Sequence, residues 1–156
     1  MGNNENLNQL YREVILDHHR SPRGSEELSD PEIETVGFNP VCGDKLKLQV
    51  KVNKNGVIEK VGCLSEGCSI SVASASIMAE EIQGKKVEDA RAMVEKFRSM
   101  MAGKDSINSQ YGDLEALEGV KMFPVRIKCA LLPWATLANG IDRYEGKTTD
   151  DVAKTE

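Results

Sequence analysis

The segment KLKLQVKV at residues 45–52 decides the fold, because its apolar and polar side chains alternate strictly along the chain. This two-residue period places leucine and valine on one face of a strand and lysine on the other, as in an antiparallel strand with one wet face. The next residues, NKNG at 53–56, tolerate positive φ, and a β-rich pattern resumes from Val57 to Cys63. The sequence therefore predicts a β-hairpin, which a short strand over Ile33–Phe38 would widen.

Helical patterns flank the predicted hairpin on both sides. Apolar residues recur every three or four positions, glycines follow two of these stretches, and a proline opens the last one. The predicted helices cover Leu7–His19, Ser69–Gln83, Val87–Met101 and residues 123–141. We expect only a short helical turn within Asp105–Gly119, and a frayed polar tail from about residue 145 to 156. The predicted class is α+β, a small antiparallel sheet packed against several α-helices.

Length and charge limit the possible functions. The 156 residues fit a single domain over 1–156, and a net charge of −5 makes nucleic acid an unsuitable partner. The longest apolar run, Cys129–Leu132, is far shorter than the ~20 residues that span a bilayer, and Met1–Gln9 shows no secretory pattern. We expect a cytoplasmic protein without membrane contact, in which cysteines serve as metal ligands or nucleophiles.

The four cysteines differ in local setting. Cys42 lies in a loop between a proline and a glycine, with Asp44 close enough to present an oxygen to the same point. Cys68 begins a predicted helix, where free N–H groups and the helix dipole favour a thiolate. Cys129 lies in the first turns of the last helix beside cationic residues, which would also favour its ionised form. Cys63 ends a strand and is predicted to be a buried bystander.

Three thiolates and one carboxylate form a donor set that suits tetrahedral zinc or a corner of an iron–sulfur cluster. The sequence lacks the paired Cys-x-x-Cys knuckles of an ordinary structural zinc site. Spacing alone leaves two interpretations open, a joint metal site and scattered core cysteines. If zinc is bound, the single oxygen donor is its most replaceable ligand.

Three ordered segments lead to a resemblance. They are NPVCGD at 39–44, GCSISVASAS at 67–76 and KCALL at 128–132, and LDHHRSPR at 16–23 is also consistent. In this order and with these separations they resemble the NifU/IscU-type iron–sulfur cluster assembly family. The resemblance covers about Leu7 to Tyr144 and implies a mixed sheet-and-helix fold of the SufE/NifU type.

The sequence departs from the scaffold branch of that family in two features, and in both it resembles another branch. Lys128 precedes the third cysteine, where the scaffold branch has histidine, and MFPVR at 122–126 replaces its chaperone-docking segment. The interval from Cys68 to Cys129 is also longer, with extra residues around Met101–Gly119. Both features resemble the SufU branch of Gram-positive bacteria. That resemblance implies Zn²⁺ held by Cys42, Asp44, Cys68 and Cys129, and persulfide sulfur received from SufS, a PLP-dependent cysteine desulfurase, and passed to iron–sulfur assembly proteins.

The leading hypothesis is a zinc-dependent sulfurtransferase, not a conventional small-molecule enzyme. It would accept sulfur from the cysteine desulfurase and activate that desulfurase. Docking of the desulfurase would displace one zinc ligand, and the released thiolate would attack the persulfide. Cys42 is the candidate acceptor, because a loop residue can move without unwinding a helix. Cys129 as the carrier and Cys63 as a substitute ligand stay open. So do two other functions, a scaffold for a transient [2Fe–2S] cluster and a structural zinc clip in an interaction module.

Two further groups of residues have simpler explanations than metal binding. His18 lies on the apolar side of its helix and is predicted to pack at the edge of the core, while His19 is predicted to be exposed. The small residues of the helix after Cys68, from Ser71 to Ser76, are interpreted first as a close-packing face and second as polar lining for the site.

Overall fold

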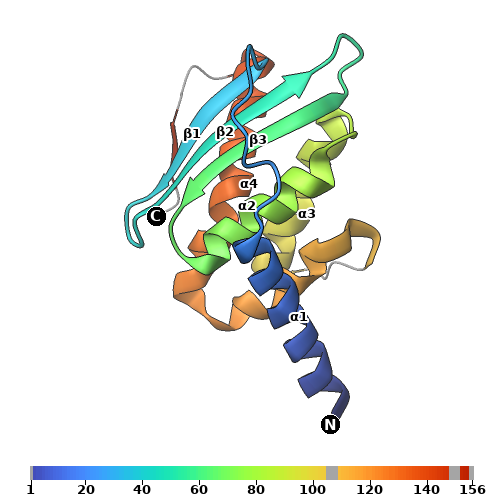
Figure 1. Ribbon diagram of the computed structural model, residues 1–156, viewed down its shortest axis with the longest axis vertical. Helices are drawn as coiled ribbons and strands as arrows, with labels where there is room; N and C mark the ends of the chain where they lie inside the picture. Colours follow the sequence, from blue (N-terminus) through green and yellow to red (C-terminus); the bar gives the residue numbers. More distant parts are fainter. Residues whose placement is uncertain (1, 105–108, 148–151, 155–156) are drawn as a thin grey trace.

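A sheet lies against a layer of helices in the computed structural model, which describes residues 2–104, 109–147 and 152–154 (Figure 1). The strands are β1 (Ile33–Asn39), β2 (Asp44–Val52), β3 (Ile58–Glu66) and β4 (Val152–Lys154). The helices are α1 (Gly2–Arg20), α2 (Ser69–Ile82), α3 (Val87–Met101), the 3₁₀ helix η1 (Ser109–Met122) and α4 (Pro124–Tyr144). None of the described helices has the length and apolar character needed to cross a lipid bilayer.

The sheet has the order β3-β2-β1-β4, and its first three strands are antiparallel. The predicted hairpin is confirmed, with Leu48 opposite Cys63 in β3 and the side chains of Leu46, Leu48 and Val50 buried. Asn53 closes the β2–β3 turn by accepting the N–H groups of Asn55 and Val57 on its side-chain oxygen, at 2.9 and 3.0 Å. The β1–β2 turn brings Asn39 opposite Asp44.

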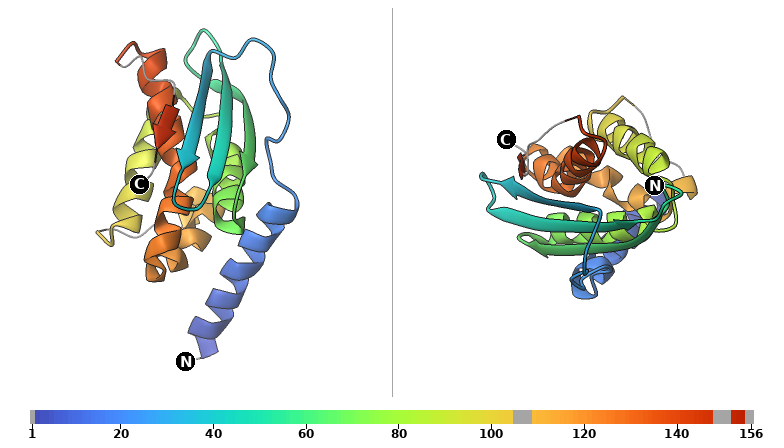
Figure 2. Two further views of the ribbon diagram at one scale, coloured as in Figure 1. Left: turned by 90° about the vertical axis from the view of Figure 1, so that its left-hand side faces the viewer. Right: turned by 90° about the horizontal axis from the view of Figure 1, so that it is seen from above.

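Helices α2 and α4 pack against the sheet, and α3 packs against α4 (Figure 2). Trp134 of α4 is fully buried and stacks on Phe97 of α3 with a ring-centroid distance of 5.1 Å. The small residues of α2 allow close approach of α4, since Ser74 donates its hydroxyl to the Ala130 carbonyl at 2.7 Å and accepts the Trp134 indole N–H at 3.1 Å. The core therefore fixes the start of α4, where Cys129 lies, relative to the sheet.

The predicted α+β class is confirmed, and three details of the prediction are corrected. Helix α1 begins at Gly2, earlier than Leu7, because polar residues without apolar periodicity continue it. A 3₁₀ helix of 14 residues replaces the short turn expected before α4. Residues 152–154, expected to fray, form β4 and pair in parallel with Val36–Phe38, because the open edge of β1 offers free backbone groups. The other predictions for 105–108 and for 148–151, 155 and 156 lie outside the described residues.

Candidate metal centre

Three of the four predicted ligands meet at one end of the sheet. Cys42 comes from the β1–β2 turn, Asp44 from the first position of β2 and Cys129 from α4, and one ligand atom of each lies within 4.8 Å of the others. Asp44 and Cys129 are fully buried, whereas Cys42 is half-buried. Gly43 adopts a φ of 75° and donates its N–H to the Asn39 carbonyl at 2.8 Å, so the tight turn presents Cys42 beside Asp44.

Donors surround the Asp44 carboxylate. Its Oδ1 accepts the Cys68 N–H at 3.0 Å and the Ser71 hydroxyl at 3.2 Å, and its Oδ2 accepts the Asn39 amide at 3.2 Å. Burial by itself would raise the pKa of Asp44, but these hydrogen bonds, the Cys68 N–H first, outweigh burial and hold the pKa below its usual value. The carboxylate is therefore anionic and fixed in place, as a metal ligand must be.

Cys68 lies at the edge of this group. It is the N-cap of α2, as predicted, and its Sγ accepts the Ser71 N–H at 3.5 Å. Its sulfur contacts that of Cys129, but Cys68 is not part of the group whose ligand atoms all lie within 4.8 Å. The structure thus brings together Cys42, Asp44 and Cys129, with Cys68 adjoining them.

The prediction for the ionisation of Cys129 is corrected. Arg126 does contact the Cys129 sulfur, and this contact raises the pKa of the guanidinium. Burial, followed by hydrogen bonding to Asp44, nevertheless raises the pKa of the Cys129 thiol well above its usual range. A buried thiol beside a carboxylate becomes a thiolate only when a cation compensates both negative charges, and a bound metal ion is such a cation.

Cys63 lies apart from the group, in the middle of β3. It is buried, and burial raises its pKa to about 12, so the prediction of a buried cysteine is confirmed. A neutral thiol inside the core is chemically inert at neutral pH.

A second cluster pairs His18 with two carboxylates. His18 is fully buried, with Nδ1 2.7 Å from Ser76 Oγ and Nε2 2.7 Å from Asp113 Oδ2, and Glu80 lies close enough to complete a possible ligand set. Arg23, however, already contacts Glu80 at 3.4 Å. Because Arg23 already supplies a positive charge to this cluster, the cluster is explained as a packing contact and not as a metal site. This agrees with the interpretation of His18 from the sequence. His19 is exposed.

Sequence reasoning missed the residues that hold the ligands in place. Asn39 is fully buried and hydrogen-bonds to Asp44, a role that its place directly across the predicted turn could have suggested. Gly67 has a φ of 145°, and a Cβ there would collide with Asp44 Oδ1. Ser71 belongs to the polar lining of the site, which is the second of the two interpretations of the small-residue face.

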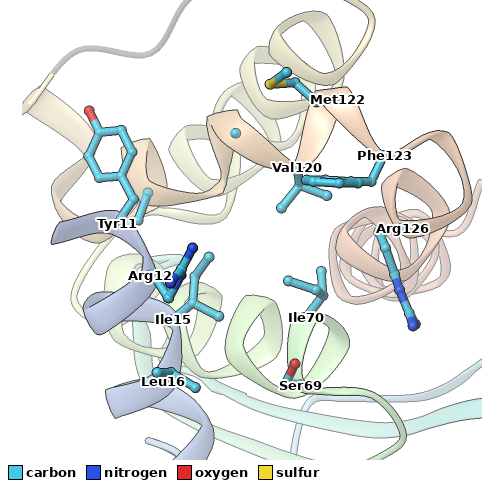
Figure 3. Close-up of a pocket in the computed structure, with 12 residues that line it drawn as sticks. Tyr11, Arg12, Ile15, Leu16, Ser69, Ile70, Val120, Met122, Phe123 and Arg126 are labelled. Atoms are coloured by element: carbon cyan, nitrogen blue, oxygen red, sulfur yellow. The ribbon is translucent and has the colours of Figure 1, made fainter. Parts of the chain in front are cut away.

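An apolar hollow adjoins the metal centre. Figure 3 shows Ile15 of α1, Ile70 of α2 and Val120 of η1 around this hollow, with Phe123 at its edge. The hollow has a volume of about 390 Å³. Arg126 lines the hollow and also contacts Cys129. The site therefore borders a surface of apolar character.

The sequence of the chain matches a known protein family. The family model of the NifU-like N-terminal domain matches residues 10–151 of the chain. The chain belongs to this NifU-like family.

Members of the NifU-like family include relatives with two kinds of name. The chain is 45% identical over 147 residues, 94% of its length and 99% of the relative's, to the zinc-dependent sulfurtransferase SufU of Bacillus subtilis. It is 38% identical over 138 residues, 88% of its length and 86% of the relative's, to the iron–sulfur cluster assembly scaffold protein IscU of Streptococcus pyogenes.

A solved NifU-like structure supports the fold. The crystal structure of a protein described as an iron–sulfur cluster assembly scaffold for the SUF system, from Fervidobacterium islandicum, superposes with a TM-score of 0.77 at 31% identity. The match covers 83% of this chain and 94% of that one.

The residues present fit a metal ion of the zinc type. Two sulfurs and a buried carboxylate oxygen converge, a third sulfur adjoins them, and thiolates together with a carboxylate select zinc or an iron–sulfur cluster over hard cations. The surrounding donors orient Asp44 as outer partners orient metal ligands in general.

Proposed function

We propose that this protein is a zinc-dependent sulfurtransferase of iron–sulfur cluster assembly, which receives persulfide sulfur from a cysteine desulfurase of the SufS type. The observation that carries the proposal is the convergence of Cys42, Asp44 and Cys129, in which the turn residue Cys42 is half-exposed and the other two are buried. The similarity to the Bacillus subtilis sulfurtransferase over 94% of the chain supports it. A reducing cytoplasm is the compartment that keeps such thiols free.

Cys42, Asp44, Cys68 and Cys129 would hold the zinc ion. The first, second and fourth already lie within 4.8 Å of one another, and Cys68 joins them through its contact with Cys129. Bound zinc would keep the thiols ionised at neutral pH and protect them from oxidation.

Cys42 would carry out the transfer step, because it lies on a turn that can move without unwinding a helix and is half-exposed, whereas Cys68 begins α2 and Cys129 is buried within α4. Its thiolate attacks the terminal sulfur of the donor's cysteine persulfide, and a new S–S bond forms at Cys42. The S–S bond of the donor breaks, its electron pair leaves with the donor cysteine as a thiolate, and the terminal sulfur moves with its proton. The exchange is balanced and needs no external oxidant.

The partner surface would surround the centre. Val41, Phe123 and Val125 are 67%, 62% and 62% exposed, and they come from the two segments that carry Cys42 and Cys129. Large apolar side chains exposed next to a reactive centre favour a protein partner that buries them. A desulfurase would bring its persulfide loop to this surface, and downstream iron–sulfur assembly proteins would collect the sulfur.

The test combines metal analysis with persulfide mapping. The purified protein is analysed for zinc, incubated with a SufS-type desulfurase and cysteine, and the persulfide is located by mass spectrometry. We expect close to one zinc per chain, persulfide mainly on Cys42 with a minor share on Cys129, and loss of most of the persulfide in a folded Cys42→Ser variant. Cys63→Ser serves as the matched control and should behave as wild type. Absence of persulfide from every cysteine, with no rise in desulfurase turnover, would refute the proposal.

The scaffold function is the second candidate, since the Streptococcus pyogenes relative carries a scaffold name over 88% of this chain. The same residues would then hold a transient [2Fe–2S] cluster as cargo. A brown protein with visible charge-transfer absorption and little zinc would favour the scaffold. A zinc clip of purely structural purpose would instead make Cys42→Ser unfold.

A further inference from the structure

Asn39 is the residue on which the contacts of the centre converge. It ends β1, is fully buried, and lies opposite Asp44 in the strand register. Its side-chain amide nitrogen lies 3.2 Å from Asp44 Oδ2 and 3.7 Å from Cys129 Sγ. Its side-chain oxygen accepts the Val41 N–H at 3.3 Å, and its carbonyl accepts the Gly43 N–H at 2.8 Å. One side chain therefore touches the Cys42 turn, the carboxylate and the buried sulfur.

The two hydrogens of the amide nitrogen have separate acceptors. A primary amide can donate to two groups at once, and Asp44 Oδ2 and Cys129 Sγ are the two acceptors in reach. A hydrogen bond donated to a thiolate stabilises its negative charge, and a thiolate stabilised in this way is a weaker nucleophile.

The thiols of the candidate metal centre differ in the N–H groups that donate hydrogen bonds to them. Cys129 receives the Asn39 amide and the Arg126 contact, and Cys68 receives the Ser71 N–H. Among the described residues no N–H group donates a hydrogen bond to Cys42 Sγ, whose sulfur contacts that of Cys129. Cys42 is thus the sulfur without a stabilising N–H donor.

We propose that Asn39 is a positioning residue that weakens Cys129 as a nucleophile through its amide N–H and so directs sulfur to Cys42. The inference rests on the proposed sulfurtransferase function and adds the reason for the choice between two neighbouring thiolates. Asn39 acts through Cys129 and Asp44 and takes no part in bond breaking.

The test replaces the donor and retains the turn. In Asn39→Ser the serine hydroxyl can still accept the Val41 N–H in a short turn. The serine side chain is too short to keep both contacts of the asparagine amide, with Asp44 Oδ2 and with Cys129 Sγ. Asn53→Ser is the matched control, because Asn53 caps the β2–β3 turn in the same manner, at the far end of β2 from Asp44. Circular dichroism and thermal unfolding establish that both variants are folded.

Two measurements report the loss of the Asn39 side-chain N–H donor. In Co²⁺-loaded protein, loss of an N–H···S bond shifts the sulfur-to-cobalt charge-transfer band to lower energy, and we expect this shift in Asn39→Ser and not in Asn53→Ser. After incubation with desulfurase and cysteine, the share of persulfide on Cys129 should rise at least three-fold in Asn39→Ser. An unchanged band together with an unchanged persulfide distribution in folded Asn39→Ser would overturn the inference.

A measurement on the unaltered chain covers the case in which Asn39→Ser fails to fold. In ¹¹³Cd²⁺-loaded protein the Asn39 side-chain amide proton should show a scalar coupling to cadmium through the sulfur, and absence of coupling at the assigned resonance would overturn the inference. The cobalt and cadmium spectra require no sulfur transfer. If no cysteine gains persulfide while these spectra behave as expected, the proposed function fails and the Asn39 contact stands.

Discussion

Gly67 shows at the scale of one residue how the backbone makes room for the Asp44 carboxylate. Its φ of 145° is unfavourable for side-chain-bearing residues, and its missing Cβ leaves the space that Asp44 Oδ1 occupies. The glycine is therefore needed for both conformation and contact. Gly84 has a φ of 87°, and a Cβ at that position would meet nothing within 4 Å, so it has the conformational need alone.

The comparison of Gly67 with Gly84 predicts different effects when each glycine is replaced by alanine. Both Gly67→Ala and Gly84→Ala should lose about 1–3 kcal/mol of unfolding free energy through backbone strain. Only Gly67→Ala should also displace Asp44, so we expect at least a ten-fold loss of zinc affinity in a competition titration with a chromophoric chelator. Equal zinc affinity of the two variants would contradict the proposed role of Asp44 as a ligand.

Cys63 gives a pH-dependent prediction at the same scale. Burial raises its pKa from 9.0 to about 12, so the unfolded chain releases this proton at lower pH than the folded one. The stability that depends on the neutral thiol is complete below about pH 9 and is lost as pH rises toward 12.

Between pH 8 and pH 10 metal-free wild type should lose about 1 kcal/mol of unfolding free energy relative to Cys63→Ala, since one pH unit above the unfolded pKa corresponds to about that amount. Urea unfolding under reducing conditions measures the difference. A constant difference across that range would mean that Cys63 ionises as easily folded as unfolded.

At the scale of elements, side-chain hydrogen bonds join η1 to α1 in addition to the apolar contacts that Leu114, Leu117 and Val120 make in the core. The Tyr11 hydroxyl donates to Glu115 at 2.6 Å, and His18 lies 2.7 Å from Asp113. The His18 ring is fully buried, so loss of its partner leaves a buried polar nitrogen unsatisfied.

We expect Asp113→Ala to lower the unfolding free energy by about 1–3 kcal/mol and to speed hydrogen exchange across residues 112–122. Glu118→Ala is the control, because its partner Lys121 lies on the same helix at 3.3 Å, and its loss should cost no more than about 0.5 kcal/mol. Equal effects of the two substitutions would show that η1 does not depend on the His18 contact.

The elements also show how far sequence reasoning reaches. Alternation at 45–52 and helical periodicity identified β2 and the three helices of the core, because burial imposes a period on the sequence. The start of α1, the extent of η1 and the pairing of β4 depend on backbone hydrogen bonds that leave no apolar period. Similarly, Cys42, Asp44 and Cys129 could be selected by residue type, whereas Asn39 and Gly67 act through contacts that only the folded chain creates.

At the scale of the whole molecule, the candidate metal centre joins three segments at a place where the apolar core does not hold them together. The β1–β2 turn, the start of α2 and the start of α4 meet at Cys42, Cys68 and Cys129, outside the apolar cluster around Trp134. We therefore expect a metal ion bound here to add stability without being required for the fold.

Zinc at about 100 times its dissociation constant should add about 2.7 kcal/mol, which raises the melting temperature by roughly 5–10 °C. Removal of zinc by a chelator should reverse this shift while the far-ultraviolet circular dichroism at 25 °C stays unchanged. Complete unfolding on chelation would indicate a structural zinc clip instead. Cys63→Ser should show the same zinc-dependent shift as wild type.

Strand β4 has a practical consequence for anyone who handles the protein. It covers Val36–Phe38, just before Asn39, so a truncation before Val152 would uncover part of the edge of β1 close to the Cys42 turn. The opposite end of the chain is different, because α1 projects away from the body at its start (Figure 1). Affinity tags and fluorescent labels are therefore better attached ahead of α1 than behind β4.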